Sequence, residues 1–88
     1  MTWRVTWERR AANELRRLAR RDPDMARRIG QAVTRLAETG QGDVKRLEGR
    51  LNEWRLRVGD WRVRFERFPQ ERILFVLRVA PRKDAYQR

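Results

Sequence analysis

Four arginines in a predicted β-hairpin are the residues of this sequence whose type and spacing most clearly favour a particular chemistry. Residues 54–65 alternate apolar and basic side chains around a central glycine-aspartate dipeptide, which is typical of a two-residue hairpin turn. Because strand side chains alternate between faces, Arg57 falls opposite Arg62 and Arg55 opposite Arg64 on one face. The other face carries six apolar residues: Trp54, Leu56, Val58, Trp61, Val63 and Phe65. Like charges directly opposite each other destabilise a sheet, so the arginine side indicates a polyanionic ligand.

The composition excludes several other chemistries. The chain has no cysteine, histidine or serine, which rules out disulfides, thiolate or imidazole metal sites, and Ser-His or Cys-His nucleophiles. Any catalysis must come from Arg, Lys, Tyr, Thr, Asp, Glu or the backbone, and we expect no metal and no cofactor. Apolar runs fall short of the roughly 18 residues of a membrane span, and the N-terminus has no signal-peptide pattern. We therefore expect a cytoplasmic protein without a membrane partner.

The charge balance points to the same kind of ligand as the hairpin. The net charge is +11, from 23 basic and 12 acidic residues, and arginine supplies every basic residue except Lys45 and Lys83. A GC-rich genome accounts for the choice of arginine over lysine, but not for the excess of positive charge or its place on one hairpin face. Such an excess indicates nucleic acid or an acidic protein as the partner.

The first forty residues predict a strand and a helical hairpin. Residues 3–7 alternate as a short strand, and residues 8–21 carry an apolar stripe at helical spacing. A second helix is expected over residues 22–40, with Asp22 as its N-cap and Gly40 as its C-terminal cap. The short connection between the helices predicts that they run antiparallel.

The second half of the chain predicts the rest of a small sheet. Residues 41–52 read as a loop, the arginine hairpin follows, and residues 73–80 are apolar on both faces, as in a central strand. Arg78 is the only charge in that strand and is expected on the side of Leu74 and Val76. The predicted fold class is α+β with the order β-α-α-β-β-β, in which two helices pack against one face of a largely antiparallel sheet.

This order, with three short motifs, resembles the RelE/ParE superfamily, the toxins of bacterial type II toxin-antitoxin systems. The motifs are K-x-L-x-G at 45–49, RVGDWRV at 57–63 and RKDAY at 82–86. The resemblance spans essentially the whole chain and implies a RelE-like fold and a single toxin domain over residues 1–88. RelE-type members are ribosome-dependent endoribonucleases that cleave mRNA. ParE-type members share the fold but poison DNA gyrase, and they generally lack the basic catalytic set.

The resemblance also implies roles for individual residues. It places three residues in catalysis: Arg62, Arg82 and Tyr86. It places Arg55 and Arg57 on the same active face, where they would hold the flanking RNA backbone. From the basic hairpin, loop and tail themselves we further expect RNA contacts for Arg64, Lys45 and Lys83. The retained arginines and terminal tyrosine favour the nuclease over the gyrase poison. Many relatives have lysine at one or both positions matching 55 and 57, and histidine just before the arginine matching Arg82; here those positions hold Arg55, Arg57 and Pro81.

The implied reaction is metal-independent attack of a ribose 2′-hydroxyl on the adjacent phosphate. Arg62 and Arg82 would clamp the phosphate and assist the leaving oxygen, because guanidinium donors stabilise the charge that develops there. Tyr86 would stack on a base or orient the nucleophile. Arginine stays protonated and is a poor general base. The candidates for the proton acceptor are therefore Tyr86, Lys83 and a carboxylate such as Glu53.

Several alternatives stay open at this stage. The chain would otherwise be an inhibitor of DNA gyrase, or an RNA-binding module without catalysis. For the arginines of residues 8–21 we favour a solvated surface over contact with an antitoxin or ribosomal RNA, and for the four tryptophans we favour core packing over base stacking. The expected partners are a cognate acidic antitoxin and mRNA on the ribosome.

Overall fold

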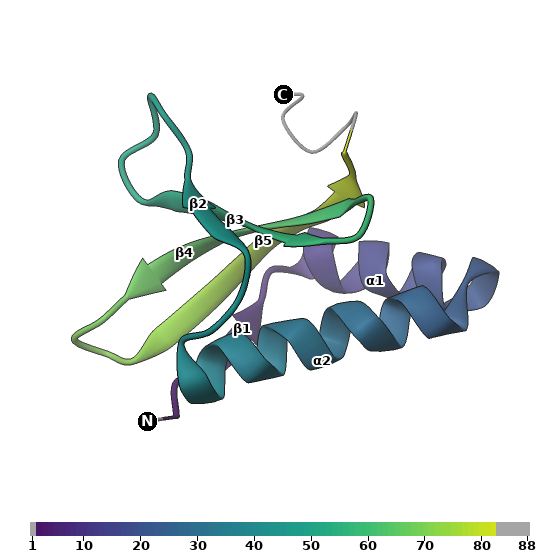
Figure 1. The fold of residues 1–88 in the computed structure, drawn as a ribbon, viewed down its shortest axis with the longest axis horizontal. Helices are drawn as coiled ribbons and strands as arrows, with labels where there is room; N and C mark the ends of the chain where they lie inside the picture. Colours follow the sequence, from purple (N-terminus) through teal and green to yellow (C-terminus); the bar gives the residue numbers. More distant parts are fainter. Residues whose placement is uncertain (1, 83–88) are drawn as a thin grey trace.

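The computed structural model describes residues 2–82, which form two helices and a five-stranded sheet. The strands lie in the order β1-β5-β4-β3-β2, with β1 parallel to β5 and every other pair antiparallel. Both helices lie on one side of this sheet (Figure 1). The predicted α+β fold class is thus confirmed. The elements are β1 (Arg4–Trp7), α1 (Arg9–Arg21), α2 (Pro23–Thr39), β2 (Val44–Arg46), β3 (Glu53–Val58), β4 (Trp61–Phe68) and β5 (Ile73–Pro81).

Asp22 joins the two helices by capping both of them. Its backbone N–H donates to the Leu18 carbonyl at the end of α1 (2.7 Å), and its carboxylate accepts from the Met25 N–H in the first turn of α2 (3.1 Å). Gly40 ends α2 in the left-handed region at φ 76°, where a glycine carries no Cβ penalty. The predicted helical hairpin and both of its caps are confirmed.

The core lies between the helices and the apolar side of the β3–β4 hairpin. The observed register pairs Arg57 with Arg62 and Arg55 with Arg64, as the two-residue turn predicts. Trp54 and Trp61 are partly buried against the core, which agrees with the packing role expected of them. The buried residues of the core are Ala11, Leu18, Ala26, Ile29, Val33, Ala37, Leu56, Val58, Val63, Phe65, Leu74, Val76 and Val79.

A β-bulge in β5 changes which face its charged residue occupies. Strand β5 lies between β1 and β4, so its expected central position is confirmed. The register with β4 shifts between Arg64 and Phe65: Phe65 pairs with Val76, but Arg64 pairs with Arg78. The extra residue reverses the alternation, so the expectation that Arg78 lies on the side of Val76 is wrong. Arg78 instead lies opposite Arg64.

The structure adds one strand where the sequence predicts only loop. Residues 44–46 form β2 at the edge of the sheet, and Val44 pairs with Leu56 while Lys45 pairs with Arg55. Three residues are too few to show a clear alternation, and the strand exists because β3 offers it a free edge to pair with. Within residues 2–82, neither helix is long and apolar enough to cross a membrane.

Glu14 of α1 completes the sheet where β1 stops. The last register pair of β1 is Trp7 with Val76, so β5 has an open edge beyond that point. There the Glu14 carboxylate accepts from the Val79 backbone N–H (2.8 Å) and from the Arg78 Nε (2.9 Å). The side chain of Glu14 is only 12% exposed. One buried carboxylate thus fixes the bulged end of β5 to α1.

Replacing Glu14 therefore tests this attachment. Glu14→Ala leaves the Val79 N–H and the Arg78 guanidinium without their acceptor, and we expect the free energy of unfolding to fall by about 2 kcal/mol. Glu14→Gln keeps an oxygen for the Val79 N–H and should lose less. Urea unfolding measures both, with Glu71→Ala in the exposed β4–β5 turn as the control. Equal stability of Glu14→Ala and the control would contradict the role of Glu14.

Candidate nucleic-acid interface

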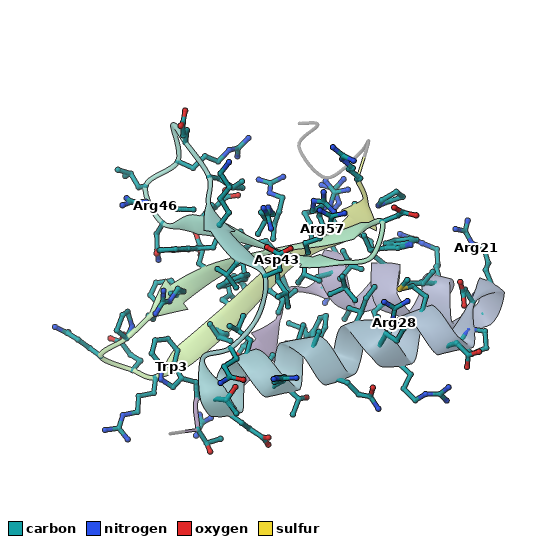
Figure 2. All side chains as sticks on the ribbon, viewed as in Figure 1. Trp3, Arg21, Arg28, Asp43, Arg46 and Arg57 are labelled. Carbon is teal, nitrogen blue, oxygen red and sulfur yellow. The ribbon has the colours of Figure 1, made fainter. Side chains whose placement is uncertain are left out.

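Basic residues form two rows across the side of the sheet that faces away from the helices. In the longer row, Lys45 pairs with Arg55, Arg55 with Arg64, and Arg64 with Arg78, over four neighbouring strands. In the shorter row, Arg57 pairs with Arg62, and Arg62 pairs with Ala80. Directly opposed side chains have Cβ atoms about 5 Å apart, so these charges are close neighbours. We call this surface the arginine face: Lys45, Arg55, Arg57, Arg62, Arg64 and Arg78. Arg57 of this face is labelled in Figure 2.

Carboxylates from α1, from β3 and from the segment before β2 offset much of the repulsion in the longer row. Glu53 Oε2 accepts from Arg64 Nη2 (2.5 Å) and Nε (3.0 Å), in a pair that is largely buried. Asp43 Oδ1 lies 3.2 Å from Arg55 Nη1, and Glu14 holds the guanidinium of Arg78. The opposed arginines of this row are therefore partly explained by internal ion pairs, which the sequence did not reveal.

The shorter row lacks this compensation. Among residues 2–82, no carboxylate forms an ion pair with either arginine of this row. Arg57 is exposed and its Nε donates to the Gly59 carbonyl (3.3 Å). Arg62 is 5% exposed, and its Nη1 donates to the Trp61 carbonyl (3.2 Å). Among the arginines of this face, the two without a carboxylate partner from residues 2–82 thus lie next to the β3–β4 turn.

Arg62 has a donor that nothing in the described chain satisfies. Its Nε is buried and has no hydrogen-bond partner among residues 2–82. A buried donor left without an acceptor is costly, and more so when it belongs to a charged group. A bound phosphate oxygen would satisfy both the hydrogen-bonding capacity and the charge. Arg62 therefore has the properties of an anion-binding residue.

Arg82 is held at the same end of the sheet. Its backbone N–H donates to the Asp60 carbonyl in the β3–β4 turn (2.8 Å), and Pro81 pairs with Trp61. Ala80 lies opposite Arg62, and Arg82 comes two residues after Ala80. Arg82 is exposed. The structure therefore brings the backbone of Arg82 next to the shorter row. The predicted site residues Lys83 and Tyr86 lie outside the described residues.

The proposed proton acceptor Glu53 is occupied by ion pairs. One of its oxygens binds Arg64, and the other lies 3.3 Å from Arg50 Nη1. A carboxylate whose two oxygens both lie against guanidinium groups is not free to turn toward a substrate. Glu53 thus stabilises the arginine face, while Lys83 and Tyr86 stay candidates for the base.

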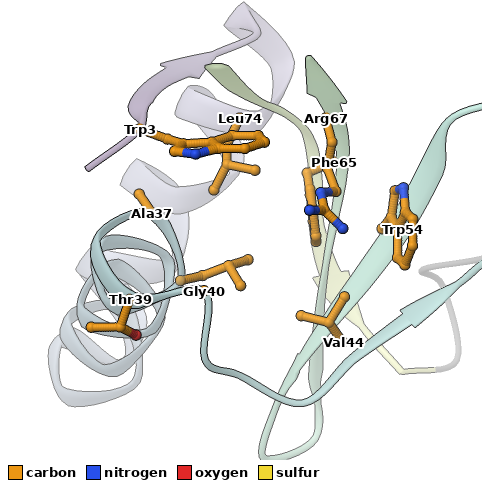
Figure 3. Close-up of a pocket in the computed structure, with 10 residues that line it drawn as sticks. Trp3, Ala37, Thr39, Gly40, Val44, Trp54, Phe65, Arg67 and Leu74 are labelled. Carbon is orange, nitrogen blue, oxygen red and sulfur yellow. The ribbon is translucent and has the colours of Figure 1, made fainter. Parts of the chain in front are cut away.

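A separate hollow opens on the helix side of the sheet. It has a volume of about 400 Å³ and lies between the C-terminal end of α2 and strands β3 and β4. At its side the guanidinium carbon of Arg67 lies 4.9 Å from the ring centre of Trp54 and 5.6 Å from that of Trp3 (Figure 3). None of the predicted site residues within 2–82 lines this hollow. It is therefore distinct from the arginine face.

Sequence reasoning missed the acidic residues that organise the site. Glu14 appears in the sequence as one acid among helix arginines, and its contact with Arg78 joins residues 64 positions apart. Asp43 was expected in a loop, and its pairing with Arg55 depends on the short strand β2. Only Glu53 carries a signal, because it lies two residues before Arg55 on the same strand face.

Comparisons with known proteins agree with this architecture. A chain of the archaeal RelE-RelB complex from Pyrococcus horikoshii is 26% identical to this chain, with 97% of this chain and 100% of that one covered and a TM-score of 0.77. A chain of the RelBE2 toxin-antitoxin complex from Mycobacterium tuberculosis is 19% identical, with 93% and 100% covered and a TM-score of 0.78. A mutant of Escherichia coli RelE in the free state is 15% identical, with 97% and 88% covered and a TM-score of 0.78.

The comparison with protein families is more specific. None of the curated proteins matches the chain in sequence. The family model for the ParE toxin of the type II toxin-antitoxin system parDE matches residues 5–86, nearly the whole chain. The chain therefore belongs to the ParE toxin family of type II toxin-antitoxin systems, and its fold is that of the RelE-like toxins.

Proposed function

We propose that this toxin is an endoribonuclease that cleaves mRNA on the ribosome without a metal ion. The observation that carries the proposal is the state of Arg62, a buried arginine whose Nε has no hydrogen-bond partner among residues 2–82, next to the exposed Arg57. A fold can offset opposed arginines internally, as it does for Arg64 with Glu53. Leaving one charged donor unsatisfied lowers stability, and an incoming phosphate supplies the missing acceptor.

The reaction assigned to this site is attack of a ribose 2′-hydroxyl oxygen on the adjacent phosphorus. The new P–O bond closes a cyclic phosphate, and the P–O5′ bond breaks with its electron pair going to the leaving 5′ oxygen, which takes up a proton. Arg62 and Arg82 bind the non-bridging oxygens, where negative charge accumulates in the transition state. Arg57 binds the flanking backbone. Tyr86 or Lys83 accepts the proton of the attacking hydroxyl, since the carboxylate of Glu53 is held by ion pairs.

A second function is favoured by one specific observation. The matching family model describes the ParE toxin, and ParE-type toxins, as noted above, poison DNA gyrase. A gyrase inhibitor acts through contact with a protein surface and needs no phosphate clamp. The unsatisfied Arg62 and the uncompensated Arg57 support the nuclease over this alternative, and RNA cleavage discriminates the two.

The partner that restrains the toxin is proposed to be an acidic antitoxin. Three observations support it: the net charge of +11, the family match, and the RelE-RelB complexes among the similar structures. An acidic segment that folds on binding would neutralise the basic surface of the toxin. Masking Arg57 and Arg62 in this way would also block access of RNA.

The double substitution Arg62→Ala/Arg82→Ala tests the proposed clamp. We expect it to abolish growth arrest and to reduce cleavage of translated mRNA at least 100-fold, because both donors to the scissile phosphate are lost. Mapping of RNA ends after expression in a bacterial host measures the cleavage. Arg72→Ala, in the β4–β5 turn, is the matched control. Undiminished cleavage by a folded double variant would exclude this site, and intact mRNA with an induced DNA-damage response would indicate gyrase as the target.

Arg57 and Arg64 should differ although both lie on the arginine face. Arg64→Ala removes the buried partner of Glu53, so we expect the free energy of unfolding to fall by roughly 3 kcal/mol. Arg57→Ala removes an exposed charge, so stability should change by less than about 0.5 kcal/mol. The affinity of Arg57→Ala for single-stranded RNA should fall. The salt dependence of its RNA binding should weaken by about 0.7 in slope, because one phosphate contact is lost. A stable Arg64→Ala together with a destabilised Arg57→Ala would contradict these roles of the two arginines.

A further inference from the structure

A second basic surface lies beside the arginine face, around the open edge of β5. It is a groove of about 490 Å³ between the C-terminal half of α1 and the last residues of β5. Arg17, Arg20 and Arg21 line it from α1, and Trp61 lines it from the start of β4. Figure 2 shows Arg21 at the C-terminal end of α1. From the sequence alone, these helix arginines are expected to form a solvated surface.

The three helix arginines of the groove carry uncompensated charge. All three are exposed, and none forms an ion pair with a residue of the described chain. Glu14 is the one acidic residue among the described groove-lining residues, and Arg78 together with the Val79 N–H already engages its carboxylate. The groove therefore has an excess of positive charge that an anionic ligand can neutralise.

Helix stability does not explain this clustering. Basic residues in the last turn of a helix interact favourably with its dipole, which favours Arg20 and Arg21. Arg17, however, is placed three and four residues before them, where like charges repel by a comparable amount. The two effects offset each other, so the fold gains little from carrying all three arginines. The helix dipole therefore does not by itself account for the three arginines, and they are available to an external ligand.

Trp61 adds an aromatic surface to this charge and connects the groove to the arginine face. It is half-buried, and it pairs with Pro81, the residue before Arg82. Its neighbour in the chain is Arg62, which lies on the opposite side of the sheet. A groove with free guanidinium groups and an aromatic ring is the arrangement with which proteins hold single-stranded nucleic acid, the phosphates on the cations and a base on the ring.

We propose that this groove binds the RNA strand beyond the cleavage site. The phosphates flanking the scissile one contact Arg17, Arg20 and Arg21, and a base stacks on the exposed part of Trp61. The strand passes from Arg62 on the arginine face, past Arg82, to the end of α1. This inference rests on the proposed function and deepens it, because it names a path for the substrate that the catalytic residues alone do not define.

Binding of fluorescein-labelled oligouridylates at several KCl concentrations tests the path. The groove variant is Arg17→Gln/Arg20→Gln/Arg21→Gln. The matched control is Arg4→Gln/Arg27→Gln/Arg35→Gln, which removes the same charge from exposed positions outside the groove. For a 12-nucleotide RNA, the salt slope of the groove variant should weaken by about 2, as expected for three lost phosphate contacts on a single strand. The control should change by less than half of that, and for a 4-nucleotide RNA the two variants should behave alike.

The inference is overturned if the groove variant and the control lose the same salt slope with the 12-nucleotide RNA, or if the wild-type protein binds neither RNA. Cleavage of ribosome-bound mRNA by the wild-type protein, measured in parallel, separates this inference from the proposed function. RNA binding that depends on the groove without any cleavage would refute the nuclease and leave the groove as an RNA site. Cleavage with no groove dependence would refute the path and leave the nuclease standing.

Discussion

Arginines face each other directly across β3 and β4, and the repulsion between them sets the organisation of this small protein. The hairpin has to present its apolar residues to the helices, so strand alternation leaves the arginines together on the opposite side. The fold offsets this repulsion with three acids: Glu53 at the start of β3, Asp43 from the segment before β2, and Glu14 from α1. The ion pairs of Asp43 and Glu14 also attach the segment before β2 and helix α1 to the sheet.

The uneven distribution of these acids defines the site. The longer row receives all three carboxylates, while Arg57 and Arg62 of the shorter row receive none from the described residues. The same face thus contains arginines that stabilise the fold and arginines that are held ready for an external anion. Arg82 is fixed next to the second group by the bond from its N–H to the Asp60 carbonyl. The proposed phosphate clamp therefore lies at the end of the sheet where the arginines have no carboxylate partner among the described residues.

Local sequence patterns predicted the parts of this fold that local rules decide. The β3–β4 register follows from one turn and strict alternation, and the helical hairpin follows from the caps at Asp22 and Gly40. The bulge that reverses Arg78 could not be read from residues 73–80, because it is a property of pairing with β4. The role of Glu14 depends on where β1 ends relative to β5. Strand alternation puts Arg57 and Arg62 on the same face and does not distinguish them. In the structure Arg62 is buried and Arg57 is exposed.

NMR of the arginine Nε–Hε groups tests most directly whether the buried Nε of Arg62 donates to a phosphate oxygen when nucleic acid binds. A short 2′-deoxy oligonucleotide is titrated into the nitrogen-15-labelled protein, because it offers the phosphates but lacks the attacking hydroxyl. We expect the Arg62 Nε–Hε signal to move downfield and saturate, whereas that of Arg64, already bound to Glu53, stays nearly fixed. An Arg62 signal that does not move while only exposed arginines respond would contradict it.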